Sequence, residues 1–198
     1  YSPGACSLSP HIALEEAGLK YQAIKADLKT KQTEAGADYK TVNPLGYVPA
    51  LALEDGTLLT EGPAIVQYIA DKAPDKKLAP ASGSMDRYKL QSWLNFVSSE
   101  VHKGFSPLFH PAMPDDAKKL AKERLGTRFA HLEQHFAKQQ YLMGKDYSVA
   151  DGYLFTTLNW TKPTGIDLSP YPNLQAYHQR VAARPAVQAA MKAEGLLK

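Results

Sequence analysis

Apolar residues recur at helical spacing through most of the second half of the chain. Three stripes with a period near 3.6 residues run through Leu90, Trp93, Leu94, Val97 and Val101; through Leu125, Phe129, Leu132 and Phe136; and through Leu174, Tyr177 and Val181. The segment after Ser148 is apolar nearly all round, which predicts a central, buried helix. Ser148 and Asp151 have the spacing of a capping box at its start. We therefore predict an all-helical domain over residues 84–198.

The first 73 residues alternate between short strand-like and helical segments. The predicted order is a helix that begins at Cys6 and ends before Gly18, a strand over 21–28, a helical turn over 38–42, a hairpin of strands 46–53 and 58–59, and a helix after Pro63. Mixed elements of this kind predict an α/β domain over residues 1–73. A stretch rich in Pro, Ala, Lys and Ser over residues 74–83 is typical of a linker.

Composition and charge exclude several functions. The net charge is +3 and no basic run is dense, so we expect no nucleic-acid partner. No apolar run is long enough to cross a bilayer, and the first residues do not resemble a signal peptide, so we expect no membrane association. A single cysteine excludes an internal disulfide and fits a reducing cytoplasm. Because Tyr1 falls at what looks like the end of a strand, we expect a few residues to precede it in the native protein.

Cys6, the single cysteine, lies where the first helix is predicted to begin. A helix N-terminus presents unpaired N–H groups and a partial positive charge, which favour a thiolate or bind the anion of a second thiol. The alternative is that Cys6 is a small, buried apolar residue, the usual role of a lone cysteine. Its position between loop and helix favours the reactive interpretation but does not decide it.

Two segments that contain proline suit a peptide-like ligand. Pro49 cannot donate to a sheet, and a cis Val48–Pro49 bond would leave the backbone of Val48 open to an extended peptide, although composition alone does not establish a cis bond. In the segment 60–63, a helix start beside glycine could bind a carboxylate while Glu61 pairs with an amino group. Ordinary helix capping explains this second segment equally well.

Polar residues form a second stripe on the helix predicted after residue 84. Asn95, Ser99 and His102 share the helical period, and they are donor and acceptor types suited to a cleft rather than the Lys and Glu of an ordinary solvated face. A solvated face remains the usual explanation of such a stripe. His131 and His135 are four residues apart, but no carboxylate or cysteine of suitable spacing accompanies them, so we expect no metal site.

These segments together resemble the cytosolic glutathione transferases, and most closely the bacterial beta class. The stretches that carry the resemblance cover nearly the whole chain in order: 1–11, 43–51, 59–65, 93–96, 100–105 and 148–151. The cysteine-containing start, together with the His-Lys-Gly-Phe of residues 102–105, is specific to that class. The resemblance implies a thioredoxin-like N-terminal domain, an all-helical C-terminal domain, a homodimer, and a glutathione site in the cleft between the domains.

The resemblance also implies roles for single residues in the first domain. Cys6 would lie beside the sulfur of glutathione and could form a mixed disulfide with it. Val48, before a cis Pro49, would pair with the cysteinyl backbone of glutathione, and Lys31 would reach its glycyl carboxylate. Glu61 and the amide of Gly62 would hold the γ-glutamyl end. Many related classes have Ser at the position of Gly62, so this chain would lack one hydroxyl contact there.

In the second domain, the resemblance implies contacts to glutathione from Asn95, Ser99, Glu100, Val101 and His102. His102 would face the sulfur and donate or accept a proton, and Tyr1 matches an auxiliary tyrosine near the sulfur. We expect catalysis to involve Cys6, His102 and Tyr1. The pocket for an electrophile is expected around residues 105–114 and near Trp160. These residues are apolar and aromatic, which predicts a hydrophobic electrophile.

The predicted function is conjugation of the glutathione thiolate to hydrophobic electrophiles, with glutathione as co-substrate and without a metal. One alternative is thiol–disulfide exchange or reductive dehalogenation that depends on glutathione and uses Cys6 as the nucleophile. A second alternative is a non-enzymatic ligand-binding protein on the same scaffold, because a fold does not fix a function.

Overall fold

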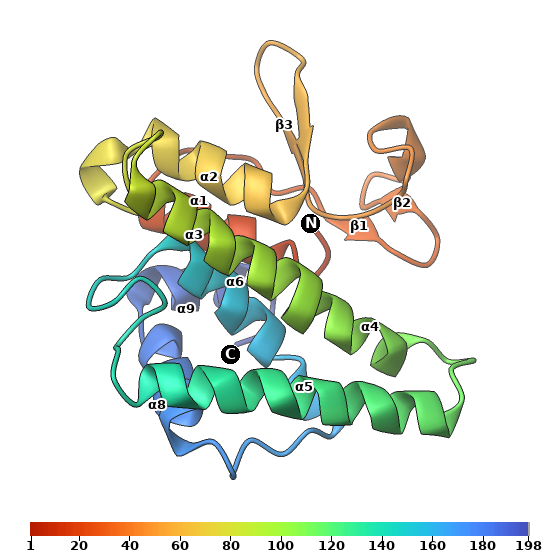
Figure 1. Ribbon diagram of the computed structural model, residues 1–198. Coiled ribbons are helices and arrows are strands. Elements are labelled where there is room, and N and C mark those ends of the chain that lie inside the picture. Colours follow the sequence, from red (N-terminus) through yellow and green to blue (C-terminus); the bar gives the residue numbers. More distant parts are fainter. Residues whose placement is uncertain (198) are drawn as a thin grey trace. The chain divides into compact units, whose positions relative to one another are not determined.

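Helices form where the apolar stripes predict them, and the computed structural model describes residues 1–197 (Figure 1). The helices are α1 (Leu8–Ala17), α2 (Gly62–Lys72), α3 (Met85–Phe96), α4 (Lys103–Phe109), α5 (Asp115–Phe136), α6 (Val149–Leu158), α7 (Thr161–Thr164), α8 (Pro172–Ala182) and α9 (Pro185–Ala193), with 3₁₀ turns η1 (Tyr39–Thr41) and η2 (Pro74–Lys76) and a π-helix η3 (Val97–His102). The strands are β1 (Ala26–Asp27), β2 (Gln32–Thr33), β3 (Ala50–Ala52) and β4 (Leu58–Thr60). None of the helices in this part of the chain has the length and apolar character of a bilayer crossing.

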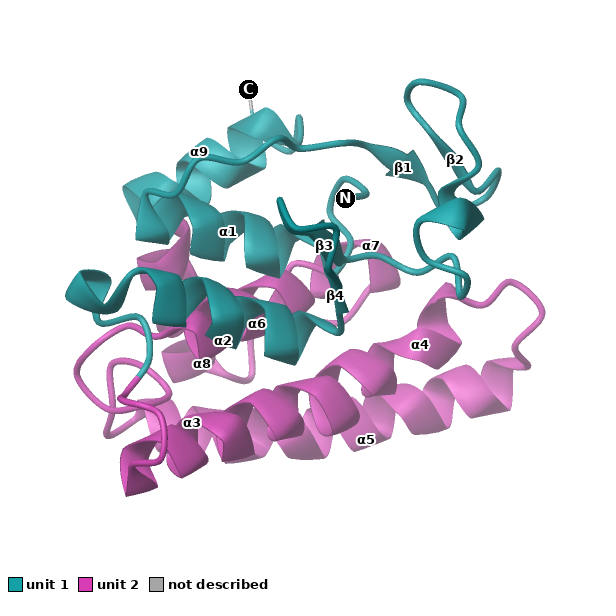
Figure 2. Cartoon of the chain, turned by 90° about the horizontal axis from the view of Figure 1, so that it is seen from above, with its two compact units in different colours: residues 1–79, 184–198 teal, residues 80–183 magenta. Residues whose placement is uncertain are grey.

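The chain forms two units, which Figure 2 shows in different colours. The N-terminal unit comprises residues 1–79 and 184–198, and the helical unit comprises residues 80–183. The last helix, α9, therefore belongs to the N-terminal unit, whereas the sequence placed it in the helical domain. The physical reason is that α9 packs against α1 and buries Val187 and Ala190. At its start, the guanidinium of Arg184 donates to both carboxylate oxygens of Glu16, at 2.5 and 2.8 Å.

In the N-terminal unit, α1 and α2 lie side by side (Figure 1). Their apolar side chains are buried in the core. The first helix ends at Gly18, which adopts the left-handed conformation (φ 66°) that glycine accommodates without strain. The hairpin predicted around residues 54–57 is present as β3 and β4, which pair antiparallel with Ala50 opposite Thr60. The predicted helical turn near residue 40 is η1. The local turn signals of this unit are thus confirmed.

The strand predicted over residues 21–28 is largely absent, because only β1 forms there and pairs with β2. The amino group of Tyr1 donates to the carbonyl oxygen of Ile24, and the amide of Ala26 donates to the carbonyl oxygen of Tyr1, both at 2.7 Å. Beyond these bonds, the segment borders a cavity of about 1000 Å³ that α1, α2 and β3 also line. Without a continuous partner strand, residues 21–25 do not form a ladder.

In the helical unit, α3, η3 and α4 follow one another without a break and run alongside α5 (Figure 1). The predicted stripes are confirmed, since their residues are buried except for Trp93, which is only half-buried. Every residue of α6 is buried, as predicted for a central helix. The capping box is also present, with the side chain of Asp151 accepting from the backbone N–H of Ser148 at 2.9 Å.

Candidate functional site

Cys6 lies in the turn that leads into α1, one residue before the capping residue Ser7. The carbonyl oxygen of Cys6 accepts from the amide of Ser9 at 3.2 Å, and the amide of Leu8 donates to Ala5 at 3.0 Å. The first amides of the helix thus bond to the carbonyls of the turn. The half-buried thiol donates to the carbonyl oxygen of Val48 at 3.1 Å. Cys6 is therefore a hydrogen-bond donor to the residue that precedes the cis proline.

The backbone before Val48 is fixed by two buried side chains. The phenol of Tyr39 and the amide nitrogen of Asn43 both donate to the carbonyl oxygen of Tyr47, each at 2.8 Å. Burial raises the pKa of Tyr39, so its phenol remains a donor. The Val48–Pro49 peptide bond is cis, as the resemblance implied. The amide of Val48 donates no hydrogen bond within residues 1–197, whereas its carbonyl accepts from Cys6.

Lys31, Glu61 and Gly62 belong to the same unit as Cys6. The ammonium of Lys31 donates to the carbonyl oxygen of Gly46 at 3.0 Å, which holds it on the loop before Val48. Glu61 precedes α2 with a positive φ of 67°, an unusual and costly conformation for a residue other than glycine that is often found at functional sites. Its side chain is exposed and makes no capping bond. Gly62 then opens the helix, and apart from its chain neighbours and its own helix backbone no heavy atom lies within 4 Å of the position that a Cβ would take.

The helical unit carries the other predicted contacts on α3 and η3. Asn95 and Ser99 are exposed, and the hydroxyl of Ser99 donates to the carbonyl oxygen of Asn95 at 2.9 Å. The carboxylate of Glu100 accepts from Arg128 at 2.5 and 2.8 Å. Val101 is fully buried, so it can offer a ligand only its backbone. Because η3 is a π-helix, the polar stripe does not keep the phase of an α-helix through residues 97–102.

His102, the last residue of η3, contacts the aromatic side chains of Tyr153 on α6 and of Trp160, the residue before α7. Its Nδ1 lies 2.6 Å from the hydroxyl of Tyr153, and its ring meets that of Trp160 edge-on at 4.9 Å between centroids. Burial, followed by the nearby charge of Lys103, lowers the pKa of His102 to about 4. The imidazole is therefore neutral near pH 7, with one nitrogen that donates and one that accepts.

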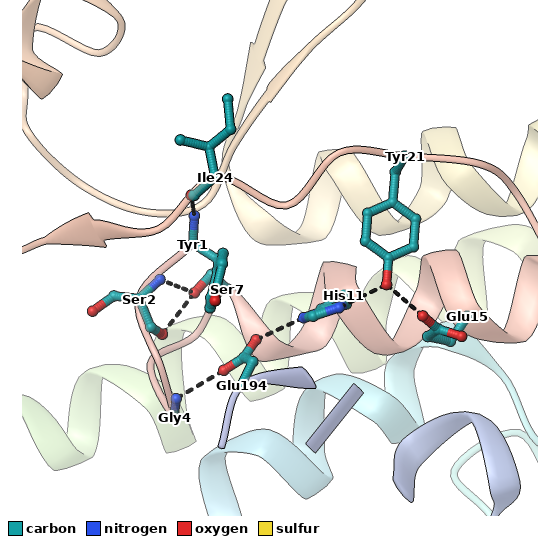
Figure 3. Close-up of polar contacts among 9 residues, drawn as sticks. All are labelled: Tyr1, Ser2, Gly4, Ser7, His11, Glu15, Tyr21, Ile24 and Glu194. Carbon is teal, nitrogen blue, oxygen red and sulfur yellow. Dashed lines mark hydrogen bonds and ion pairs between the residues drawn. The ribbon is translucent and has the colours of Figure 1, made fainter. Parts of the chain in front are cut away.

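A buried hydrogen-bond network supports the turn that carries Cys6 (Figure 3). The carboxylate of Glu194 accepts from the amide of Gly4 at 2.9 Å and lies 2.9 Å from Nδ1 of His11. The other ring nitrogen of His11 lies 2.7 Å from the hydroxyl of Tyr21, which donates to Glu15. Sequence reasoning missed this network, because nothing in the local pattern relates Glu194 to a glycine 190 positions earlier.

Tyr1, predicted as an auxiliary residue, lies beside this network with its ring 5.8 Å from that of His11. Burial, followed by the charge of Glu194, raises the pKa of the Tyr1 phenol, which therefore stays protonated at neutral pH.

Within the described chain, no group of three or more His, Cys, Asp or Glu side chains is close enough to hold a metal ion.

The sequence matches two family models, the N-terminal domain of glutathione S-transferase over residues 4–72 and the C-terminal domain over residues 96–185. The chain is 44% identical over 196 residues to glutathione S-transferase GstA of Escherichia coli O157:H7, covering 99% of this chain and 98% of that protein. It is also similar to a solved sphingomonad glutathione S-transferase complexed with glutathione, at 53% identity and a TM-score of 0.96. A solved bacterial beta-class glutathione S-transferase from Sphingomonas chungbukensis is 51% identical with a TM-score of 0.97. Each structural match covers 100% of this chain and 98% of the other.

These matches confirm the predicted fold class, a thioredoxin-like N-terminal domain followed by an all-helical C-terminal domain.

Proposed function

Because the chain belongs to the glutathione S-transferase family, we propose that its N-terminal unit binds glutathione at the Cys6 turn. The predicted place in the bacterial beta class is confirmed by relatives of high identity. The same relatives confirm the predicted activity, which is transfer of a group to the thiol of glutathione, with glutathione as co-substrate. The individual binding and catalytic residues are the subject of the proposal.

The pairing of Cys6 with Val48 is the observation that carries the proposal. An extended peptide pairs with a residue through both its N–H and its C=O. The amide of Val48 has no partner within residues 1–197, and its carbonyl accepts from the Cys6 thiol. In the complex, the amide of the cysteinyl residue of glutathione replaces the Cys6 thiol as donor to the carbonyl oxygen of Val48. The carbonyl oxygen of the same cysteinyl residue accepts from the amide of Val48. This exchange releases the Cys6 side chain beside the glutathione sulfur.

Charged and polar groups of the same unit hold the two ends of glutathione. Lys31, whose ammonium already lies on the loop before Val48, binds the glycyl carboxylate. The exposed carboxylate of Glu61 pairs with the γ-glutamyl ammonium. The amide of Gly62 at the start of α2 donates to the γ-glutamyl carboxylate, which the helix N-terminus also favours electrostatically.

The helical unit supplies the remaining contacts. The side chains of Asn95 and Ser99 offer an amide and a hydroxyl, while the neutral imidazole of His102 addresses the sulfur. Glu100 contributes through its backbone, because its carboxylate already binds Arg128, and Val101 does the same because its side chain is buried. The protonated phenol of Tyr1 serves as an auxiliary donor in the N-terminal unit.

In the proposed reaction, the glutathione thiol loses its proton to solvent and the resulting thiolate attacks an electrophilic carbon. A C–S bond forms, and the leaving group, for example a halide, departs with the electron pair of the bond that breaks. The protein accelerates this step by stabilising the thiolate with hydrogen-bond donors and by holding it in position. Cys6 is not needed as a nucleophile, because the attacking sulfur belongs to glutathione.

The test is a conjugation assay with an aryl halide on wild type and Cys6→Ala, with Ser9→Ala as a control for a small buried substitution in the same segment. We expect Cys6→Ala to keep most of the wild-type kcat, because several donors share the stabilisation of the thiolate. Complete loss of conjugation in Cys6→Ala alone would contradict this distribution.

A second activity, thiol–disulfide exchange, is favoured by the half-buried position of the Cys6 thiol. The thiolate of Cys6 would attack one sulfur of oxidised glutathione, so that a mixed disulfide forms and one glutathione leaves as a thiolate that takes up a proton. Intact-protein mass spectrometry after incubation with oxidised glutathione tests this step. An adduct on wild type that is absent from Cys6→Ala supports the second activity, and its absence from both proteins excludes it.

We also propose a homodimer, a hydrophobic electrophile and a cytoplasmic location. The electrophile would contact the half-exposed ring of Phe109, which meets Trp160 edge-on at 5.6 Å in the helical unit. The cytoplasmic location is proposed because a lone cysteine fits a reducing compartment. Analytical ultracentrifugation tests the dimer, and a monomer at working concentration would refute it. A series of aryl halides of increasing apolar area tests the electrophile pocket.

A further inference from the structure

One ring nitrogen of His102 has a hydrogen-bond partner on α6. Nδ1 lies 2.6 Å from the hydroxyl of Tyr153, a short distance for a hydrogen bond between these groups. The two rings meet edge-on, with 5.9 Å between centroids, and Trp160 packs against the imidazole from α6's C-terminal side at 4.9 Å. The imidazole is therefore bonded at Nδ1 and confined by aromatic rings.

Tyr153 lies on α6, a helix that is buried along its whole length and capped at its start. Its side chain is only 2% exposed. Two residues earlier, the carboxylate of Asp151 accepts from the amides of Leu142 and Ser148 at 2.8 and 2.9 Å, which fixes the first turn of α6. The hydroxyl of Tyr153 is therefore presented from a rigid element and not from a loop.

We propose that Tyr153 is a positioning residue whose hydroxyl donates to Nδ1 of His102 and so keeps the imidazole proton on Nε2. A phenol O–H is more acidic than the N–H of a neutral imidazole, so the hydrogen bond is stronger in this direction than in the reverse. With Nδ1 occupied as an acceptor, Nε2–H is the donor that the ring offers to a ligand. This inference rests on the proposed function, in which His102 addresses the sulfur of glutathione.

The consequence for catalysis is that His102 stabilises the thiolate as a neutral donor. Burial keeps its pKa near 4, so the ring carries no charge at neutral pH that could attract the thiolate. Only the tautomer with the proton on Nε2 then gives a hydrogen bond to the sulfur. Loss of the Tyr153 hydroxyl would divide the ring between two tautomers, of which one has no proton at Nε2.

The decisive measurement is ¹⁵N nuclear magnetic resonance of the histidine rings in the full-length protein at neutral pH. The signals of His102 are assigned by their loss in His102→Gln. We expect wild type to show the Nε2–H tautomer and Tyr153→Phe to show a mixture. The matched control is Tyr171→Phe, which removes another hydroxyl of the helical unit, one that donates to the carbonyl oxygen of Gly126 at 3.2 Å, and should leave His102 unchanged.

Two results overturn the proposal: an Nδ1–H tautomer in wild type, or an unchanged Nε2–H tautomer in Tyr153→Phe. If Tyr153→Phe does not fold, the wild-type spectrum still decides, because the proposal requires the proton on Nε2.

Kinetics then separate positioning from a purely structural role. Tyr153→Phe should lower kcat for conjugation roughly three- to tenfold, the value of one hydrogen bond, with a KM for glutathione within about twofold of wild type. In a His102→Gln background, Tyr153→Phe should cause no further loss. An equal loss in both backgrounds would show that Tyr153 does not act through His102. If His102→Gln alone keeps the wild-type kcat and KM, the proposed role of His102 is wrong. The tautomer measurement still decides whether Tyr153 keeps the imidazole proton on Nε2.

Discussion

Replacing Glu194 with alanine tests whether the last helix supports the Cys6 turn. The substitution removes the acceptor for the amide of Gly4 and the partner of His11, both at 2.9 Å. A hydrogen bond to a charged group contributes about 1.5–3 kcal/mol, and breaking a buried pair costs about 3–5 kcal/mol because the remaining group is left unpaired. The side chains of His11 and Glu194 are 4% and 0% exposed, so water does not replace the lost bonds.

We therefore expect Glu194→Ala to lower the free energy of unfolding by about 3–5 kcal/mol. For a chain of this length each kcal/mol changes Tm by about 2–4 °C, so Tm should fall by roughly 6–20 °C. The assay is thermal unfolding at one fixed protein concentration, because assembly would make Tm depend on concentration. The same variant should raise the KM for glutathione several-fold, because the turn that leads to Cys6 loses its anchor.

The matched control is Glu133→Ala in the helical unit. Glu133 accepts from the backbone amides of Asn173 and Leu174 at 3.1 and 2.9 Å, so its removal also takes a carboxylate from backbone N–H groups. We expect a lower Tm with an unchanged KM for glutathione. An unchanged Tm in Glu194→Ala would refute the energetic reasoning. A lower Tm with equal KM effects in both variants would refute the link to the Cys6 turn.

Three further predictions follow from local geometry. Gly62→Ser should fold normally, because a Cβ at this position would meet no atom within 4 Å outside its chain neighbours and its own helix backbone. The new hydroxyl should lower the KM for glutathione roughly two- to tenfold, whereas Gly62→Ala should not. Gly104→Ala should lower the free energy of unfolding by about 1–3 kcal/mol, because the new Cβ would lie 2.7 Å from a methyl group of buried Leu125. In a Leu125→Ala background, the loss measured by chemical denaturation should be smaller. Burial raises the pKa of Asp151 to about 6, above its unfolded value near 4, so its protonated form adds stability that is complete below pH 4 and lost as pH rises through 6. The unfolding free energy of wild type minus that of Asp151→Asn should therefore fall by about 2 kcal/mol between pH 4 and pH 7, and a constant difference in urea titrations would contradict this.

The helical unit was predictable because a helix that buries one face leaves a 3.6-residue period in the sequence. Leu125, Phe129 and Leu132 show that period and are fully buried. The same pattern does not say which neighbour a helix covers, so α9 was assigned to the helical domain although it packs on α1. The strand expected over residues 21–28 depended on weak alternation alone, and alternation does not supply the partner strand that a ladder needs.

The candidate site divides in the same way. Val48 precedes proline, Glu61 precedes glycine, and Cys6 follows a Pro-Gly pair by two residues, and such short motifs are visible without a structure. The contact between Glu194 and Gly4 is not visible in the sequence, because it joins residues from opposite ends of the chain. The partner of His102 was also hidden, since Tyr153 appeared in the sequence only as one apolar position of a buried helix.

The hydrogen bonds of Cys6 and His102 explain why activation of glutathione should be shared among several groups. Lowering the pKa of a thiol by two units requires about 2.7 kcal/mol of preferential stabilisation of the thiolate. A single neutral hydrogen bond supplies about 0.5–1.5 kcal/mol, and His102 is neutral at the pH of the reaction. The Cys6 thiol must also leave the carbonyl of Val48 before it can face a second sulfur. No one of these side chains is sufficient, so at least two donors must act on the same sulfur, and the Tyr153 hydroxyl fixes the direction of one of them.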